Sequence, residues 1–371
     1  MNPPSIPETR KVSYYLIYFL IISMQIGIGV LGFQRIVAEP AGHDAWIAVL
    51  VSGLSIHIIL FLQFKILEYG GGDIIQAHRM AFGKWIGNVF SLLFALYFTI
   101  SAITILRTYL EVVQVWMFQE LELFWISLAF LVLIYYIVSS GFRTVTGVAF
   151  FGTVLPSYLV FTFAFIFPFS DFSNLLPIFD TNIKELAQSS LNMSLTYIGY
   201  ETMLMFYPFI KDPNKSKKWA HLGILTVTLF YTIVTALTFT FFSKDQLKET
   251  VWATLSIWKI AQLPFIERIE YIGIGNWILI ILPNLCITLW CGSRIVRQIT
   301  HLRQRKALFI LCLLVLVAVT YIEKREHINN LNTWLGRTGF YLNYAYVPIL
   351  LVILLVVRKV RSKNVSKKQQ N

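Results

Sequence analysis

The chain has 371 residues, of which 57% are hydrophobic and 13% are charged, and its formal net charge is +12. A soluble domain normally carries about 25% charged residues, so this composition excludes an ordinary soluble protein and indicates a chain surrounded mostly by lipid. The positive charges lie between apolar runs and form no basic patch, which argues against nucleic acid as a partner. Cys286, Cys291 and Cys312 lie in apolar segments without metal-ligand or disulfide spacing, so we expect them to pack in the core.

The apolar segments predict an all-α polytopic membrane protein. Crossing about 30 Å of hydrocarbon takes roughly 20 apolar residues in a helix. The first run is too long for the core of a signal peptide, which has about 7–15 residues, and we expect it to remain as the first span. Ten spans are predicted, at residues 12–35, 45–66, 86–107, 121–139, 147–169, 191–210, 219–242, 270–293, 306–322 and 340–357. Three other stretches are predicted to lie along the membrane interface, at residues 73–84, 181–189 and 251–266.

The lysines and arginines of the loops predict the orientation, because cytoplasmic loops are enriched in them. With the N-terminus inside, about two thirds of the 31 basic residues fall on the inner side of the membrane. Ten spans return the basic C-terminus to that side. The prediction is therefore a cytoplasmic tail at residues 1–11, a ten-helix transmembrane domain at 12–357 and a basic cytoplasmic tail at 358–371.

Glycines interrupt the first span at mid-membrane depth, in the run Gln25-Ile26-Gly27-Ile28-Gly29. Glycine costs about 1 kcal/mol relative to alanine inside a helix, so this run favours local unwinding. Close packing of helices through small residues explains the same glycines equally well. The sequence leaves these two interpretations open.

The sixth span carries a second interruption, in the run Tyr197-Ile198-Gly199-Tyr200-Glu201. A charged residue at the centre of a membrane helix costs roughly 2.5–3.5 kcal/mol on insertion scales, so Glu201 needs a partner or a water-filled cavity. A functional role and a purely structural pairing both satisfy that requirement. We expect Glu201 either to orient the broken helix or to contact a ligand.

Breaks in the first and sixth spans occupy matching positions if the core consists of two halves of five spans. An odd number of spans per half inverts the second half, and broken helices at equivalent positions of inverted repeats indicate a binding site at the membrane midplane. Amide groups at Gly27, Ile28 and Gly29 suit a carboxylate, whereas carbonyls near Met24, Gln25 and Tyr197 suit an ammonium group. The sequence therefore predicts a receptor for a small dipolar solute.

Polar residues on other spans are candidates for lining the same cavity. Ser101 and Thr104 lie three residues apart on the third span, and Asn284 and Thr288 lie four residues apart on the eighth. Hydroxyl groups inside membranes also bond their own helix, so each of these residues has a structural alternative. Arg107 and Glu111, four residues apart, predict an ion pair at the outer end of the third span.

Enzymatic motifs are not found in the sequence. The six histidines are scattered, and no glycine-rich phosphate loop follows a predicted strand. The sequence therefore predicts a protein that is not an enzyme and that needs no cofactor and no metal.

Five short motifs stand out along the chain: Gly32-Phe33-Gln34-Arg35, Gly83-Lys84-Trp85-Ile86-Gly87, Tyr197-Ile198-Gly199-Tyr200-Glu201, Trp252-Ala253-Thr254-Leu255-Ser256 and Phe265-Ile266-Glu267-Arg268-Ile269-Glu270. They resemble the amino acid–polyamine–organocation permeases and, more closely, the B subunit of spore germinant receptors in the spore germination permease family. Two departures are also visible, because Phe33-Gln34 stands where the family has leucine-proline and Ala253 stands where it has proline. The resemblance covers nearly the whole chain.

This resemblance implies a leucine-transporter-like fold, with a 5+5 inverted repeat and broken helices 1 and 6, in the inner membrane of an endospore. It also implies a sensor of small nutrients, typically amino acids and sometimes sugars or nucleosides. Such a subunit acts with an A subunit and a C-subunit lipoprotein. By position, the implied ligand pocket falls on the first-span break, Ser101, the sixth-span break around Gly199 with Tyr197, Tyr200 and Glu201, and Asn284 with Thr288.

Three functions remain as alternatives at this level. The first is a receptor subunit that binds a nutrient and signals through a partner. The second is an ion-coupled amino-acid transporter, which the absence of lysine or acid in the fifth span, residues 147–169, disfavours and which Glu201 keeps open. The third is a structural scaffold, for which substitutions in the pocket have no effect.

Overall fold

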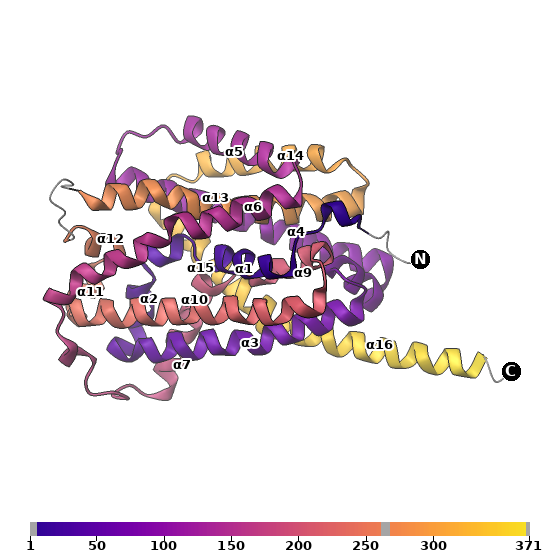
Figure 1. The fold of residues 1–371 in the computed structure, drawn as a ribbon, viewed down its shortest axis with the longest axis horizontal. Coiled ribbons are helices and arrows are strands. Elements are labelled where there is room, and N and C mark those ends of the chain that lie inside the picture. Colours follow the sequence, from indigo (N-terminus) through magenta and orange to yellow (C-terminus); the bar gives the residue numbers. More distant parts are fainter. Residues whose placement is uncertain (1–5, 261–267, 369–371) are drawn as a thin grey trace.

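The computed structural model describes residues 6–260 and 268–368, and within these ranges it is almost entirely helical. Helices run side by side along the long axis, and both termini lie at the same end of the bundle (Figure 1). We call the opposite end, which holds α11 (Lys244–Glu249) and α12 (Ala253–Trp258), the distal end. The longest elements are α3 (Ala45–Gly70), α4 (Ile74–Trp116), α5 (Leu123–Ser139), α6 (Phe142–Val154), α7 (Ile183–Asn192), α10 (Pro213–Phe241), α13 (Ile269–Thr300), α14 (Gln304–Tyr321), α15 (Arg325–Tyr341) and α16 (Val347–Lys368).

Among the described residues, seven helical stretches are long and apolar enough to cross a membrane, and two shorter apolar helices cover Tyr14–Gln25 and Leu123–Ser139. The expected span 191–210 is instead a series of short helical pieces. The chain is therefore a multi-pass membrane protein, and the count of ten spans stays a prediction. The seven stretches are Phe33–Gly70, Ile74–Trp116, Phe142–Phe169, Pro213–Phe241, Ile269–Thr300, Gln304–Tyr321 and Arg325–Arg361.

The third span begins earlier than expected. Residues 73–84, predicted to be interfacial, join the following span in the single element α4, which is kinked at Gly83 (φ 80°, ψ 175°). Asp73 caps the helix by accepting a hydrogen bond from the backbone N–H of Gln76 at 2.9 Å. A Cβ atom at Gly83 would meet no atom within 4 Å, so the positive φ rather than space requires glycine there.

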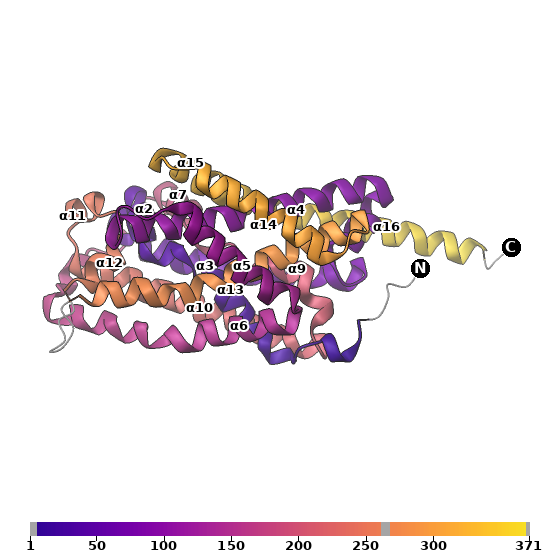
Figure 2. The same cartoon turned by 90° about the horizontal axis from the view of Figure 1, so that it is seen from above.

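Helix α13 lies at the centre of the packing and contacts α4, α6 and α14. On the other side of the bundle α3 packs along α10, and α1 (Ile17–Gln25) contacts α10 and α6. Viewed from above, α16 extends beyond the bundle toward the C-terminus (Figure 2). The arrangement encloses α1 and the short pieces of the sixth span within a continuous apolar core.

The predicted ion pair between Arg107 and Glu111 is wrong. Both residues are buried, and Arg107 donates hydrogen bonds to the backbone carbonyls of Ile322 (2.5 Å) and Glu323 (3.1 Å). The Glu111 carboxylate lies 3.8 Å from a guanidinium nitrogen of Arg325. The connection between α14 and α15 folds over this end of α4 and supplies partners that helical spacing does not predict.

The predicted interfacial stretch 251–266 is partly visible as α12. Its last residues lie outside the described part of the chain, as do Phe265, Ile266 and Glu267 of the last sequence motif.

Candidate functional site

The first span is broken where its glycines predict. Helix α1 ends at Gln25, a one-turn 3-10 helix covers Ile28–Leu31, and α2 (Phe33–Ala41) continues toward the distal end. A Cβ atom on Gly27 would lie 3.1 Å from Asn284 Nδ2. The helix is therefore both unwound and closely packed, so the two interpretations of this run hold together.

The sixth span breaks at Gly199. Helix α8 (Ser194–Tyr197) ends two residues earlier, and a one-turn 3-10 helix (Tyr200–Thr202) and α9 (Met203–Phe206) follow. Gly199 has φ 120°, a conformation that residues with a side chain rarely adopt. A Cβ atom there would lie only 2.7 Å from the carbonyl oxygen of Met24. Backbone geometry and close approach therefore both require glycine at this position.

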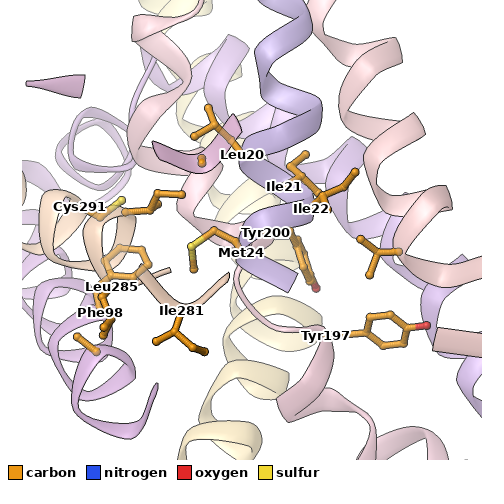
Figure 3. Packing of buried hydrophobic residues seen from close by; sticks show 14 of the residues in the cluster. Leu20, Ile21, Ile22, Met24, Phe98, Tyr197, Tyr200, Ile281, Leu285 and Cys291 are labelled. Atoms are coloured by element: carbon orange, nitrogen blue, oxygen red, sulfur yellow. The ribbon is translucent and has the colours of Figure 1, made fainter. Parts of the chain in front are cut away.

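The two breaks contact each other directly. Gln25 Nε2 donates a hydrogen bond to the carbonyl of Tyr197 at 2.8 Å. The Tyr231 hydroxyl of α10 donates to the carbonyl of Gln25, also at 2.8 Å. Figure 3 shows Met24 on the side of Phe98, whereas Tyr197 points away from it. These bonds satisfy carbonyl groups that unwinding releases and fix the relative position of the broken segments.

Glu201 is buried and holds the second break in place. Its Oε1 accepts a hydrogen bond from the Tyr97 hydroxyl at 2.6 Å, and its Oε2 accepts from the backbone N–H of Gly199 at 2.8 Å. Asn343 Nδ2 donates to the same Oε2 at 3.3 Å. Within the described part of the chain, Glu201 has no ion pair with a basic side chain. It therefore connects the broken segment to α4 and to the π-helical turn Leu342–Tyr346 that precedes α16.

A cavity of about 440 Å³ lies where the two breaks meet and extends to the distal end. It brings together most of the residues that the sequence predicts, from the first, third, sixth and eighth spans. They are Gln25, Gly27, Ile28, Gly29, Ser101, Gly199, Glu201, Asn284 and Thr288.

Tyr197 and Tyr200 do not line this cavity. Both border a second cavity of about 600 Å³ between α3, α7 and the end of α15. The Tyr197 hydroxyl donates to the carbonyl of Val49 at 3.1 Å. The two tyrosines flank Gly199, and the turn of the backbone at that glycine directs them away from the first cavity.

Two buried oxygens beside the first cavity lack hydrogen-bond partners. Gln25 Oε1 and Asn284 Oδ1 are shielded from solvent, and the described residues offer neither of them a donor. The orientation of both amides follows from their nitrogens, because Gln25 Nε2 donates to Tyr197 and Asn284 Nδ2 donates to the carbonyl of Met24 at 3.4 Å. Leaving a buried acceptor unpaired costs about 1–3 kcal/mol. The cavity therefore presents acceptor groups that a ligand with donors can satisfy.

Only some of the backbone groups that the sequence predicts to face a ligand are open to one. The carbonyls of Met24, Gln25 and Tyr197, expected to face an ammonium group, already accept hydrogen bonds from protein side chains. The backbone N–H groups of Ile28 and Gly29 start a helical turn and have no partner among the described residues. Side-chain oxygens thus replace backbone carbonyls as the open acceptors, while the expected backbone donors are present.

The hydroxyl groups of the cavity bond within their own helices. Ser101 donates to the carbonyl of Tyr97 at 2.9 Å, and Thr288 donates to the carbonyl of Asn284 at 2.8 Å. Each hydroxyl oxygen keeps the capacity to accept a further bond. These residues give the cavity a polar wall whose hydroxyl donors are already paired within the protein.

Several cavity residues were missed from the sequence. Thr196 packs against Gly29, where a Cβ atom would lie 3.2 Å from its Oγ1. Arg35 and Trp252 also line the cavity, at its distal part. Both belong to motifs that carry the family resemblance, and that membership was the available signal.

The fold is that of a class of membrane transporters. The chain superposes with Mhp1, a nucleobase-cation-symport-1 family transporter in a closed conformation with bromovinylhydantoin bound, at a TM-score of 0.63 and 12% identity over 95% of this chain and 80% of that chain. It superposes with MhsT in complex with L-phenylalanine at a TM-score of 0.56 and 12% identity, over 93% and 88% of the two chains. The leucine-transporter-like fold predicted from the sequence is thereby confirmed.

Sequence comparison narrows the class to a family. The family model described as spore germination protein matches residues 11–328, and the chain belongs to this family. It is 42% identical to spore germination protein GerQB of Bacillus cereus, over 96% of this chain and 99% of the relative. It is 27% identical to spore germination protein B2 of Bacillus subtilis (strain 168), over 70% and 72% of the two chains. The resemblance to germinant receptor B subunits is confirmed.

Proposed function

We propose that this chain is the nutrient-binding B subunit of a spore germinant receptor. A small nutrient, in the first place an amino acid, binds in the cavity between the broken helices, and the signal passes to an A subunit and a C-subunit lipoprotein. The protein lies in the inner membrane of the endospore with both termini on the core side. The distal end of the cavity then faces outward, toward arriving nutrients.

The observation that carries this proposal is the pair of unpaired acceptors beside the cavity, Gln25 Oε1 and Asn284 Oδ1. An ammonium group has three donors and no acceptor, so it matches two amide oxygens. The free N–H groups of Ile28 and Gly29 suit the carboxylate of the same molecule. MhsT, which shares the fold, is described in complex with L-phenylalanine, and this supports an amino acid as the ligand.

The test combines a nutrient screen with a matched pair of substitutions on α13. Spores lacking the gene and complemented spores are first compared on single amino acids, nucleosides and sugars. The effective nutrient is then tested on Asn284→Ala and on Asn276→Ala. The control asparagine is half-buried on the same helix and does not line the cavity, and its side chain donates to the carbonyl of Ile272.

We expect Asn284→Ala to raise the half-saturating nutrient concentration about 10- to 100-fold, because a hydrogen bond to a charged group contributes about 1.5–3 kcal/mol. Asn276→Ala should respond like the parent. Normal germination by Asn284→Ala at normal protein level would refute the proposed site and favour a scaffold.

An ion-coupled amino-acid transporter is the second candidate. The transporter fold favours it, and so does Glu201, a mid-membrane carboxylate that borders the cavity and has no basic partner among the described residues. Purified protein in vesicles separates the two functions. Sustained, gradient-driven accumulation of the nutrient would favour transport, whereas binding without accumulation would favour the receptor.

A further inference from the structure

The distal part of the first cavity is positively charged. Two arginines line it, Arg35 of α2 and Arg325 at the start of α15. Glu111 is the single acid among the described residues that lines this part, and it lies 3.8 Å from Arg325. The acid therefore neutralises Arg325, and Arg35 leaves a net positive charge at the mouth of the cavity.

Arg35 has no hydrogen bond and no ion pair among the described residues. Its side chain is half-buried, and its Nε is shielded from solvent without a partner. A guanidinium group carries five donors and stays charged at every physiological pH. Buried donors of this kind are normally paired, so an unpaired one beside a cavity indicates that an acceptor is supplied from outside the chain.

Trp252, which lines the same cavity as Arg35, adds a second unpaired donor. Its Nε1 is shielded and has no partner among the described residues. Its ring lies against the start of α2, because a Cβ atom on Gly32 would be 3.0 Å from it. Thr254, two residues later, accepts a bond from Gln34 and donates to Val30, at 2.8 and 2.7 Å. These bonds fix Trp252 beside the first turn of α2.

The unpaired side-chain groups of the cavity differ in chemical type between its two ends. Among the side chains, those at the breaks are acceptors, Gln25 Oε1 and Asn284 Oδ1, whereas those at the distal part are donors, Arg35 Nε and Trp252 Nε1. The open N–H groups of Ile28 and Gly29 lie on the turn that leads from the first break toward α2, so they extend the series of donors in the distal direction. The free arginine charge lies at the donor end. A dipolar molecule inside this cavity is therefore favoured in one direction, with its negative group toward the distal end.

We propose that the distal part of the cavity is an anion subsite centred on Arg35. It attracts the carboxylate of an entering nutrient and orients the molecule with its ammonium group toward the breaks. The assignment of the carboxylate to a nutrient rests on the proposed function. The anion preference itself is a property of the chain, which an experiment without any nutrient can measure.

A thiol introduced at the mouth of the cavity reports this preference. Gln188 is exposed and lines the cavity, and the native cysteines of the described residues are all buried. The full chain carrying Gln188→Cys is purified in nanodiscs and reacted with an anionic reagent, 2-sulfonatoethyl methanethiosulfonate. A cationic reagent, 2-(trimethylammonium)ethyl methanethiosulfonate, is used in parallel. The ratio of the two rate constants measures the local potential.

Three substitutions are compared in that background. We expect Arg35→Gln to lower the anion-to-cation rate ratio about threefold to tenfold, because one unit charge at cavity distance changes the local potential by that order. Arg35→Lys, which keeps the charge, should retain most of the ratio. Lys244→Gln removes an exposed charge of the distal end that does not line the cavity, and it should leave the ratio unchanged. An unchanged ratio in Arg35→Gln, or an equal fall in Lys244→Gln, would refute the subsite.

The nutrient enters only in a second measurement. For an amino acid found by the screen, the half-saturating concentrations of the acid and of its carboxamide are compared in spores with and without Arg35→Gln. We expect the substitution to raise the value for the acid about tenfold and to leave the value for the amide unchanged. An equal change for both would refute the assignment of the carboxylate to Arg35. A screen without any nutrient would refute the proposed function, while the labelling ratio would still decide the subsite.

Discussion

Replacing Gly199 with alanine tests whether the contact between the two breaks is essential. The residue has φ 120°, and a Cβ atom would lie 2.7 Å from the Met24 carbonyl oxygen and 3.0 Å from the Met24 Cβ. A sparsely populated backbone conformation costs about 1–3 kcal/mol. Forcing an extra methyl group into a packed region costs about another 1–3 kcal/mol. We therefore expect Gly199→Ala to destabilise the folded protein by about 2–6 kcal/mol.

Substitutions at two other glycines separate the two contributions to the expected destabilisation, backbone strain and steric crowding. Gly83 has φ 80° but open space around its Cβ position, so Gly83→Ala measures backbone strain alone. Gly147 lies inside α6 with nothing within 4 Å and an ordinary helical φ. Gly147→Ala should stabilise the helix by about 1 kcal/mol. The expected order of thermal unfolding temperatures is Gly147→Ala, parent, Gly83→Ala and Gly199→Ala, from highest to lowest.

The assay is thermal unfolding of the purified full-length variants, followed by nutrient response in spores. Gly199→Ala should lower the unfolding temperature and abolish the response, and Gly83→Ala should give a smaller thermal shift with a retained response. If Gly199→Ala unfolded at the same temperature as Gly83→Ala, the contact with Met24 would contribute nothing. That result would refute the argument that close approach requires glycine at this break.

Two further substitutions test the hydrogen bonds that hold the broken segments. Glu201→Gln should lower the unfolding temperature and weaken the nutrient response. Three donors converge on the carboxylate, and an amide leaves at least one of them unpaired, which costs about 1–3 kcal/mol of stability. Parent-like behaviour in both assays would contradict this prediction. Thr254→Val should destabilise the protein by about 2–4 kcal/mol, since it leaves the carbonyl of Val30 and the amide of Gln34 unpaired. Thr300→Val, at an exposed position of α13, serves as the control. An equal effect of the two substitutions would overturn the assignment.

The breaks themselves could be predicted from the sequence, because each is a strong exception in an apolar run. Gly27, Gly29 and Gly199 interrupt helices where nothing else in the segment favours a turn, and Glu201 is an acidic residue within an otherwise apolar run. Whether the first-span glycines unwind or pack could not be decided in advance. The structure shows that the unwound segment is also the one that other helices approach most closely.

The direction of individual side chains could not be predicted. Nearly every position of these spans is apolar, so no periodic stripe identifies the inward face. Tyr197 and Tyr200 were expected beside the ligand, yet the positive φ of Gly199 turns the chain between them and places both at the second cavity. The predicted ion pair between Arg107 and Glu111 was wrong for a related reason. The partners of both residues lie more than 200 residues later in the chain, where α14 is followed by α15.

Three residues, Leu191, Ser194 and Ile198, border both cavities. The partition between the two spaces is therefore a single layer of side chains, carried by the end of α7 and the short helix before Gly199. A movement of this layer therefore changes the wall of both cavities at once. The two cavities are thus coupled through this shared layer of side chains, and the layer ends at the break at Gly199.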